Sequence, residues 1–254
     1  MNSQPISMYV EQTGSGAPLV LLHGYPLDHS IWKPLANHLR SKARLIMPDL
    51  RGFGQSPAPT GPYPMSLFAA DVAALLDELG LQRVVLAGHS MGGYAALAFA
   101  HAYPQRLAGL ALVASQPAAD PPERREGRYA TAAQVAADGV ELVAETMAPR
   151  LTAHADLVEP LRKLILTARP AGVIGALHGM AERPDQSEFL ASLDLPTLVI
   201  AGEHDALIPL ERSREFAAML RRGRLVVIPG AGHMPMLEAP ARVSEALAAF
   251  FFQN

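Results

Sequence analysis

The feature of this sequence that most constrains its fold is an alternation of short apolar runs with longer amphipathic segments. Runs that are apolar at successive positions are typical of parallel strands buried on both faces. Six such runs occur, at residues 18–22, 43–47, 83–87, 107–113, 197–201 and 224–228. Four longer segments repeat apolar residues at the i, i+3, i+4 spacing of a helix, at residues 66–79, 91–103, 209–220 and 240–251. The alternation predicts a three-layer α/β fold with a mostly parallel sheet, whose ligand binds beyond the carboxyl ends of the strands.

The alternation stops between residues 117 and 188, where prolines separate shorter helical patterns such as 132–147 and 157–168. The prolines are Pro121, Pro122, Pro149, Pro160, Pro170 and Pro184. Because the segment is entered from one predicted strand and left through the next, we interpret residues 117–188 as a helical cap (lid). Residues 1–116 and 189–254 then form the core. A second independent domain is the alternative interpretation.

Composition excludes several classes of protein. Hydrophobic residues make up 50% of the 254 residues and charged residues 18%, which is far from the composition of disordered chains. Lys and Arg number 21 against 24 Asp and Glu, for a net charge of −3, so nucleic acid is not an expected partner. There is no cysteine, which excludes disulfides, thiolate metal sites and a cysteine nucleophile.

Targeting signals are not apparent in the sequence. Residues 1–10 carry neither a basic start nor a long apolar run, and no apolar stretch approaches the roughly 18 residues that span a bilayer. We therefore expect a cytoplasmic protein that binds no membrane.

The segment Gly88-His89-Ser90-Met91-Gly92 lies between a predicted strand and a predicted helix. A Gly-x-Ser-x-Gly sequence is weak evidence alone, but this context is the one that a nucleophile elbow requires. The glycines permit a sharp turn that exposes the serine hydroxyl, and the helix N-terminus favours negative charge beside it. Ser90 is therefore the candidate nucleophile.

A serine nucleophile needs a general base, and the base needs a carboxylate that fixes its tautomer. Two loops that follow predicted strands offer both: Gly202-Glu203-His204-Asp205 and Gly230-Ala231-Gly232-His233. The chain order Ser90, Asp205, His233 is the order typical of this elbow. Asp120 is a second candidate for the acid, but it lies at the entry to the predicted cap and further from the end of its strand.

These motifs resemble those of the α/β-hydrolase superfamily, in particular its lid-bearing esterases, lactonases and C–C hydrolases. The matching segments are residues 23–26 (HGYP), 49–56 (DLRGFGQS), 88–93 (GHSMGG), 202–205 (GEHD) and 232–233 (GH). The resemblance implies an oxyanion hole formed by the backbone N–H groups of Tyr25 and Met91, and a cap inserted after the sixth strand of the family's sheet. Only residues 7–12 precede the first turn, so we expect about seven strands rather than eight. No cofactor is implied.

The substrate pocket is harder to predict. Candidate lining residues in the core are Trp32, Ile208 and Met234, and the cap offers apolar residues, with packing inside the protein as the alternative reading for each. The cap residues are Leu142, Met147, Ile165, Ile174, Leu177 and Met180. His204, next to Asp205 and His233, could suggest a metal site, but no ligand spacing supports one, and none is expected.

The sequence thus favours a serine hydrolase, similar to carboxylesterases, that cleaves small to medium carboxylic esters through an acyl-enzyme intermediate. An enol-lactonase or a C–C bond hydrolase of the same fold is the alternative. A non-catalytic small-molecule receptor is the alternative from another class. The expected partner is a small-molecule ester or lactone, and neither its identity nor an oligomeric state follows from the sequence.

Overall fold

The computed structural model describes residues 4–252. Its centre is a seven-stranded sheet with the strand order β1-β3-β2-β4-β5-β6-β7. The strands are β1 (Val10–Thr13), β2 (Ala17–Leu22), β3 (Ala43–Pro48), β4 (Val84–His89), β5 (Leu107–Val113), β6 (Thr197–Gly202) and β7 (Gly223–Ile228). Only β1 runs antiparallel to its neighbour, β3, and the other pairs are parallel. The predicted fold class and strand number are confirmed.

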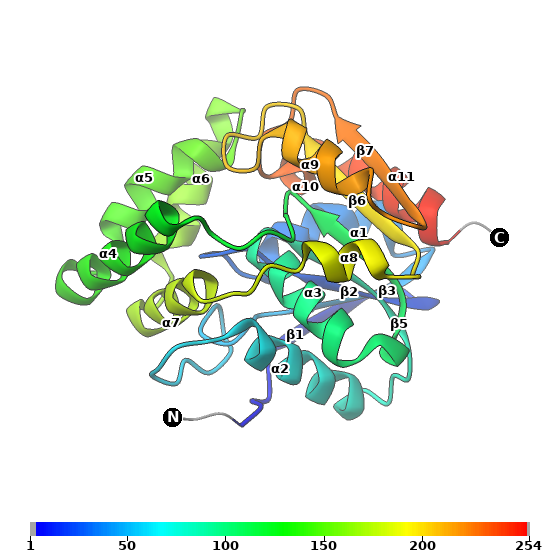
Figure 1. The fold of residues 1–254 in the computed structure, drawn as a ribbon, viewed down its shortest axis with the longest axis horizontal. Coiled ribbons are helices and arrows are strands. Elements are labelled where there is room, and N and C mark those ends of the chain that lie inside the picture. The colour runs from blue at the N-terminus through cyan, green and yellow to red at the C-terminus, as the bar shows by residue number, and fades with distance from the viewer. Residues whose placement is uncertain (1–3, 253–254) are drawn as a thin grey trace.

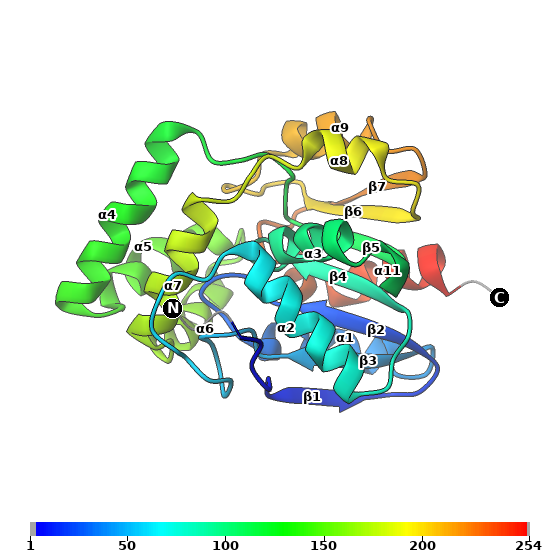
Figure 2. The same cartoon turned by 60° about the horizontal axis from the view of Figure 1, so that its bottom comes forward.

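Helices cover both faces of the sheet (Figures 1 and 2). α2 (Met65–Glu78) and α3 (Met91–Ala102) pack together on one face, and α1 (Lys33–Leu39) and α11 (Pro240–Phe251) pack together on the other. The shorter elements are η1 (His29–Trp32), η2 (Pro104–Arg106), α8 (Ser187–Ser192), α9 (Leu210–Ala217) and α10 (Pro235–Glu238).

The central strands are buried because helices lie on both of their faces. Leu19, Leu21 and Leu22 of β2 have no exposed surface, and burial of each such side chain contributes about 2 kcal/mol. Because β4, β5, β6 and β7 pair in parallel, the loops after β4, β6 and β7 lie at the same end of the sheet.

The region between β5 and β6 contains α8 and four further helices that lie at one end of the molecule, drawn in green and yellow-green in Figure 1. They are α4 (Pro122–Asp138), α5 (Glu141–Leu151), α6 (Ala155–Leu166) and α7 (Pro170–Ala181). The expectation of one helical segment over 132–147 is wrong. Gly139, with φ of +86°, ends α4, and α5 begins two residues later. α4 itself begins with Pro122 as its first residue, a position that proline favours.

The boundaries of the predicted cap, 117 and 188, remain predictions, and α8 runs across the second of them. Within residues 4–252 no single helix is long and apolar enough to span a bilayer. The pair α6 and α7 reaches that length and composition only together, and it is bent by 104° at its break.

Candidate active site

Ser90 lies at the turn from β4 into α3 in a strained backbone conformation, with φ of 49° and ψ of −112°. Such a conformation costs about 1–3 kcal/mol for a residue other than glycine and persists only where neighbours impose it. The Ser90 N–H donates to the carbonyl oxygen of Val113 at 3.0 Å, and the Ser115 hydroxyl donates to the carbonyl oxygen of Ser90 at 2.8 Å. The adjacent strand β5 therefore fixes the elbow.

The flanking glycines allow close approach of backbone segments. A Cβ atom on Gly88 would lie 2.2 Å from the carbonyl oxygen of Gly92, and one on Gly92 would lie 2.4 Å from that of Leu22. Both distances are far inside van der Waals contact with rigid backbone. Glycine is thus required at both positions for this turn.

Asp205 and His233 form a buried hydrogen-bonded pair. His233 Nδ1 donates to Asp205 Oδ2 at 2.8 Å, and each side chain is only 1% exposed. The other carboxylate oxygen, Oδ1, accepts the backbone N–H groups of Leu207 and Ile208 at 2.8 and 2.9 Å. The Asp205 carboxylate is therefore fixed in orientation, and it fixes the tautomer of His233 with the proton on Nδ1 and a lone pair on Nε2.

His89 connects the elbow to the loop that carries His233. Its Nε2 donates to the carbonyl oxygen of His233 at 2.8 Å, and the two rings lie 4.9 Å apart. Burial, followed by the nearby His233, lowers the pKa of His89, so this ring stays neutral. The contact holds the residue next to Ser90 against the predicted base.

The loop that carries Tyr25 also packs on the elbow, because a Cβ on Gly24 would lie 3.3 Å from the carbonyl oxygen of His89. His23 braces this loop. Its Nδ1 donates to the Gly24 carbonyl oxygen and its Nε2 accepts the Leu50 N–H, each at 2.9 Å. Burial lowers the pKa of His23, as an accepting ring nitrogen requires.

The two amides predicted for the oxyanion hole belong to buried residues, Tyr25 at 6% and Met91 at 0% exposure. In the part of the chain that the structure describes, no protein acceptor takes either N–H. Both groups are therefore free to donate to a ligand.

A cavity of about 460 Å³ opens at Ser90, between the core and the cap. Its size is that of a small-molecule site. The core contributes Tyr25, Ser90, Tyr94 and Leu207 to its wall. The cap contributes Arg124, Gly127, Arg128 and Thr131 from α4, Val143, Thr146, Met147 and Arg150 from α5, and Leu177 and Met180 from α7.

The structure places the predicted pocket residues unevenly. Met147, Leu177 and Met180 line the cavity. Leu142 is 52% exposed and does not line the cavity. Trp32, Ile208 and Met234 are 0–2% exposed and lie outside the lining, as do Ile165 and Ile174. Trp32 instead packs edge-on against His89, with ring centres 6.4 Å apart.

Sequence reasoning missed Glu238, which joins the cap to the His233 loop. One carboxylate oxygen accepts the Gly232 N–H at 2.8 Å. The other accepts the Thr152 hydroxyl and the Ala153 N–H, both at 2.7 Å. Its only sequence signal is a carboxylate five residues after the predicted base.

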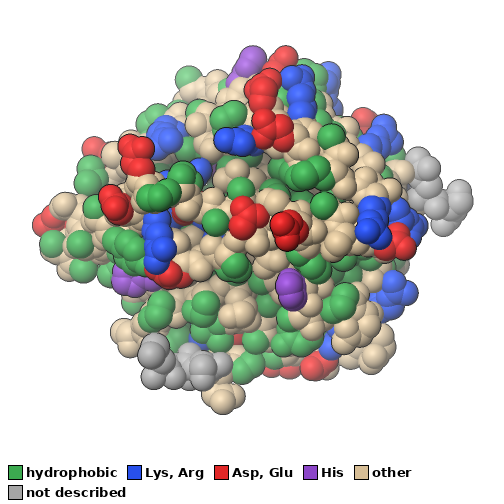
Figure 3. All heavy atoms as spheres, in the orientation of Figure 1, with side chains coloured by type: hydrophobic (Ala, Val, Ile, Leu, Met, Phe, Trp, Pro, Cys, Tyr) green, Lys and Arg blue, Asp and Glu red, His purple; other side chains and the backbone are tan. Residues whose placement is uncertain are grey.

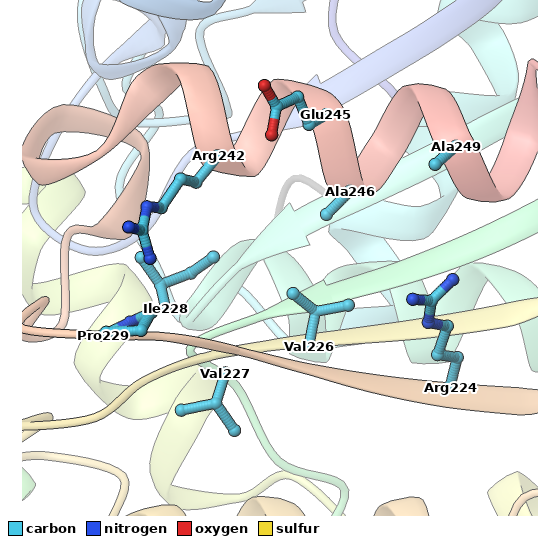
Figure 4. A pocket seen from close by; sticks show the side chains of 9 residues that line it. All are labelled: Arg224, Val226, Val227, Ile228, Pro229, Arg242, Glu245, Ala246 and Ala249. Atoms are coloured by element: carbon cyan, nitrogen blue, oxygen red, sulfur yellow. The ribbon is translucent and has the colours of Figure 1, made fainter.

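Two further features lie outside this site. Asp28, His29 and Asp49 are close enough together to hold a metal ion, but Asp49 already accepts the N–H and the Nδ1–H of His29 at 2.9 and 2.6 Å. A second hollow, of about 450 Å³, lies between β7 and α11 (Figure 4). It shares no residue with the Ser90 cavity, and Arg224, Arg242 and Glu245 are its charged side chains.

Comparisons with known proteins agree on the family. The family described as alpha/beta hydrolase fold matches residues 17–240. An esterase of Thermogutta terrifontis, solved with malate bound, is 43% identical, with a TM-score of 0.93 over 95% of this chain and 92% of that one. An enol-lactonase of Burkholderia xenovorans is 26% identical, with a TM-score of 0.89 over 97% and 96%. A pimeloyl-[acyl-carrier protein] methyl ester esterase of Edwardsiella ictaluri is 32% identical over 242 residues, 91% of this chain and 92% of that protein.

Proposed function

Because the chain belongs to the α/β-hydrolase family, we propose that it is a serine hydrolase that cleaves carboxylic esters through an acyl-enzyme intermediate. Three observations carry the proposal: the strained, cavity-lining Ser90, the buried His233–Asp205 pair, and the hydrogen bond from His89, the neighbour of Ser90, to the His233 carbonyl oxygen. Similarity to an esterase and to a methyl ester esterase supports the choice of substrate class.

The first half-reaction forms the acyl-enzyme. Ser90 Oγ attacks the ester carbonyl carbon while His233 Nε2 accepts the hydroxyl proton. The carbonyl oxygen becomes an oxyanion, which accepts hydrogen bonds from the Tyr25 and Met91 N–H groups, and loss of one such donor typically costs about 3 kcal/mol of transition-state stabilisation. The C–O bond to the alcohol then breaks, and His233 returns the proton to the leaving oxygen.

The second half-reaction releases the acid. Water attacks the acyl-Ser90 carbonyl and gives its proton to His233, the same two amides hold the new oxyanion, and Ser90 leaves with that proton. Asp205 keeps its charge throughout and stabilises the imidazolium form of His233. A cyclic ester follows the same steps, and the similarity to an enol-lactonase makes a lactone the second candidate substrate.

The test combines labelling with turnover. A serine-directed organophosphonate should label Ser90, as located by peptide mass mapping, because only an activated serine reacts quickly. Ser90→Ala should abolish both the label and hydrolysis of a short 4-nitrophenyl ester. Ser192→Ala removes an exposed hydroxyl on α8 and should retain both. Labelling at another residue, or hydrolysis that survives Ser90→Ala, would refute the mechanism, and binding without turnover would favour a receptor.

A further inference from the structure

Three arginines stand on the wall of the Ser90 cavity. Arg124 and Arg128 lie on the face of α4 that lines the cavity, together with Gly127 and Thr131. Arg150 lies near the end of α5, on the face of that helix that lines the cavity. Residues spaced by three and four positions lie on one side of a helix, so α4 presents two arginines to the cavity and α5 presents one. No lining residue is acidic.

Asp120 balances this charge only in part. Its carboxylate, which has no exposed surface, contacts Arg128, lies 2.9 Å from Arg183 and lies 3.5 Å from Arg124. Burial disfavours the charged form of Asp120, but hydrogen bonds from Arg183 and Arg128 outweigh it and lower its pKa. One negative charge is thus shared by three guanidinium groups, and the cluster stays positive.

In the described part of the chain, Arg150 lacks the carboxylate partner that Arg125 and Arg162 of the cap have. Arg125 pairs with Glu182 at 2.5 Å, and Arg162 pairs with Glu145 at 3.2 Å. Among residues 4–252 no carboxylate lies within ion-pair distance of Arg150. Outside the cavity, the face of the molecule in Figure 3 mixes both signs of charge, and the whole chain is net negative. The positive cavity is therefore a local feature and does not follow from composition.

Tyr25 adds an independent observation. Its side chain lines the cavity and is only 6% exposed, yet its hydroxyl has no hydrogen-bond partner in the described part of the chain. Burial raises the pKa of Tyr25, so the group remains an O–H donor. A buried hydroxyl without a partner is unfavourable, and an oxygen of a bound ligand would satisfy it.

From this arrangement we infer that the cavity takes esters that carry a second, anionic group, a carboxylate or a phosphate, bound by Arg150 and Arg124. The guanidinium fork matches both groups. The cavity volume of about 460 Å³ suits a small molecule rather than a macromolecular surface. The inference deepens the proposed ester hydrolysis and rests on it.

The first experiment measures preference for charge at constant shape. It compares kcat/KM for the 4-nitrophenyl half-ester of adipic acid with that of the same ester ending in a primary amide. A third ester with a terminal phosphate distinguishes the two anions. We expect the better anionic ester to exceed the amide by about tenfold or more at low salt. The preference should shrink at about 0.5 M salt, where charges are screened.

Variants then assign the preference to the cap. Arg150→Gln should reduce the anion-to-amide ratio of kcat/KM about tenfold. Arg124→Gln should reduce the ratio less, because Arg124 already contacts Asp120. Arg162→Gln, on α6 and outside the cavity lining, is the matched control and should leave the ratio unchanged.

A binding measurement separates this inference from the proposed function. Adipate is titrated by calorimetry into the Ser90→Ala protein, with and without Arg150→Gln. If the unaltered protein, with Ser90 present, hydrolyses none of the esters, ester hydrolysis is refuted, and adipate binding that Arg150→Gln weakens would still support the anion site. Equal hydrolysis of anionic and amide esters, with no adipate binding, would overturn the anion site and leave ester hydrolysis standing.

Discussion

Replacing Asp205 by Asn exchanges one carboxylate oxygen for an NH₂ group. Both oxygens of the Asp205 side chain accept hydrogen bonds in the structure. Asp205 Oδ1 accepts two backbone N–H groups, and Oδ2 accepts His233 Nδ1–H at 2.8 Å. An amide oxygen can keep the two backbone bonds, so the amide NH₂ must then face His233. Since that NH₂ can only donate, His233 Nδ1 has to become an acceptor and its proton moves to Nε2.

The size of the expected loss in kcat follows from the loss of His233 as the general base. With the proton on Nε2, His233 cannot take the Ser90 proton, and the charge that stabilises the imidazolium is gone as well. In other triads the same substitution lowers kcat by about 10⁴, which corresponds to about 5.4 kcal/mol at 1.36 kcal/mol per factor of ten. The backbone bonds survive, so we expect the fold to survive with them.

The assay is kcat for a neutral 4-nitrophenyl ester, with circular dichroism to verify folding, and Asp120→Asn is the comparator. Asp120 binds Arg128 and Arg183 in the cap and has no contact with His233. Its substitution should change kcat by less than about tenfold, while it lowers the free energy of unfolding by about 3 kcal/mol because buried guanidinium groups lose their partner. If Asp120→Asn reduced kcat more than Asp205→Asn did, Asp205 would not be the acid of the triad.

Three further outcomes are expected. Glu238→Gln should lower the free energy of unfolding by about 2 kcal/mol in urea titrations, because its NH₂ would face the Gly232 N–H; unchanged stability would contradict the role of Glu238. Burial lowers the pKa of His89 from 6.5. Below about pH 6.5, His89 is therefore protonated in the unfolded chain but neutral in the folded protein. Stability should therefore fall below about pH 6.5 by up to about 1.4 kcal/mol per pH unit from this ring, and His89→Gln should flatten that slope, whereas equal slopes would refute the assignment. Gly92→Ala should give little folded protein by circular dichroism, since its Cβ would lie 2.4 Å from a backbone oxygen; a folded, active variant would show that the elbow can relax.

The fold could be predicted from sequence where one physical cause dominates. Each of the six apolar runs became a strand, and the segment 240–251 became α11 over the same residues, because burial between layers leaves few other arrangements for such patterns. The cap was less predictable. The helical pattern continues across residue 139, but Gly139 adopts a positive φ and divides it into α4 and α5. A glycine in a helical pattern is compatible with either outcome until the packing of both pieces is known.

The same limit applies to the site. Asp205 and His233 follow strands, so topology alone predicts that they come together, and they do. The partners of Glu238 lie 6 and 86 residues away, on elements whose approach depends on how the cap closes. Arg124, Arg128 and Arg150 likewise resemble solvent-exposed charges on helices until the cap is packed on the core. The sequence pattern therefore cannot predict the roles of residues whose contacts depend on how the cap packs on the core.

The position of Glu238 connects recognition in the cap with the predicted chemistry in the core. Its carboxylate holds Thr152 and Ala153, just beyond Arg150 at the end of α5, and at the same time holds Gly232, the residue before His233. A ligand anion bound by Arg150 would therefore fix the segment that Glu238 ties to the predicted base. Binding energy from a remote part of a substrate accelerates a reaction only where it improves the geometry at the reacting atoms. We accordingly expect the anionic group of a substrate to raise kcat as well as to lower KM. Glu238→Gln should reduce the gain in kcat more than it reduces the gain in KM.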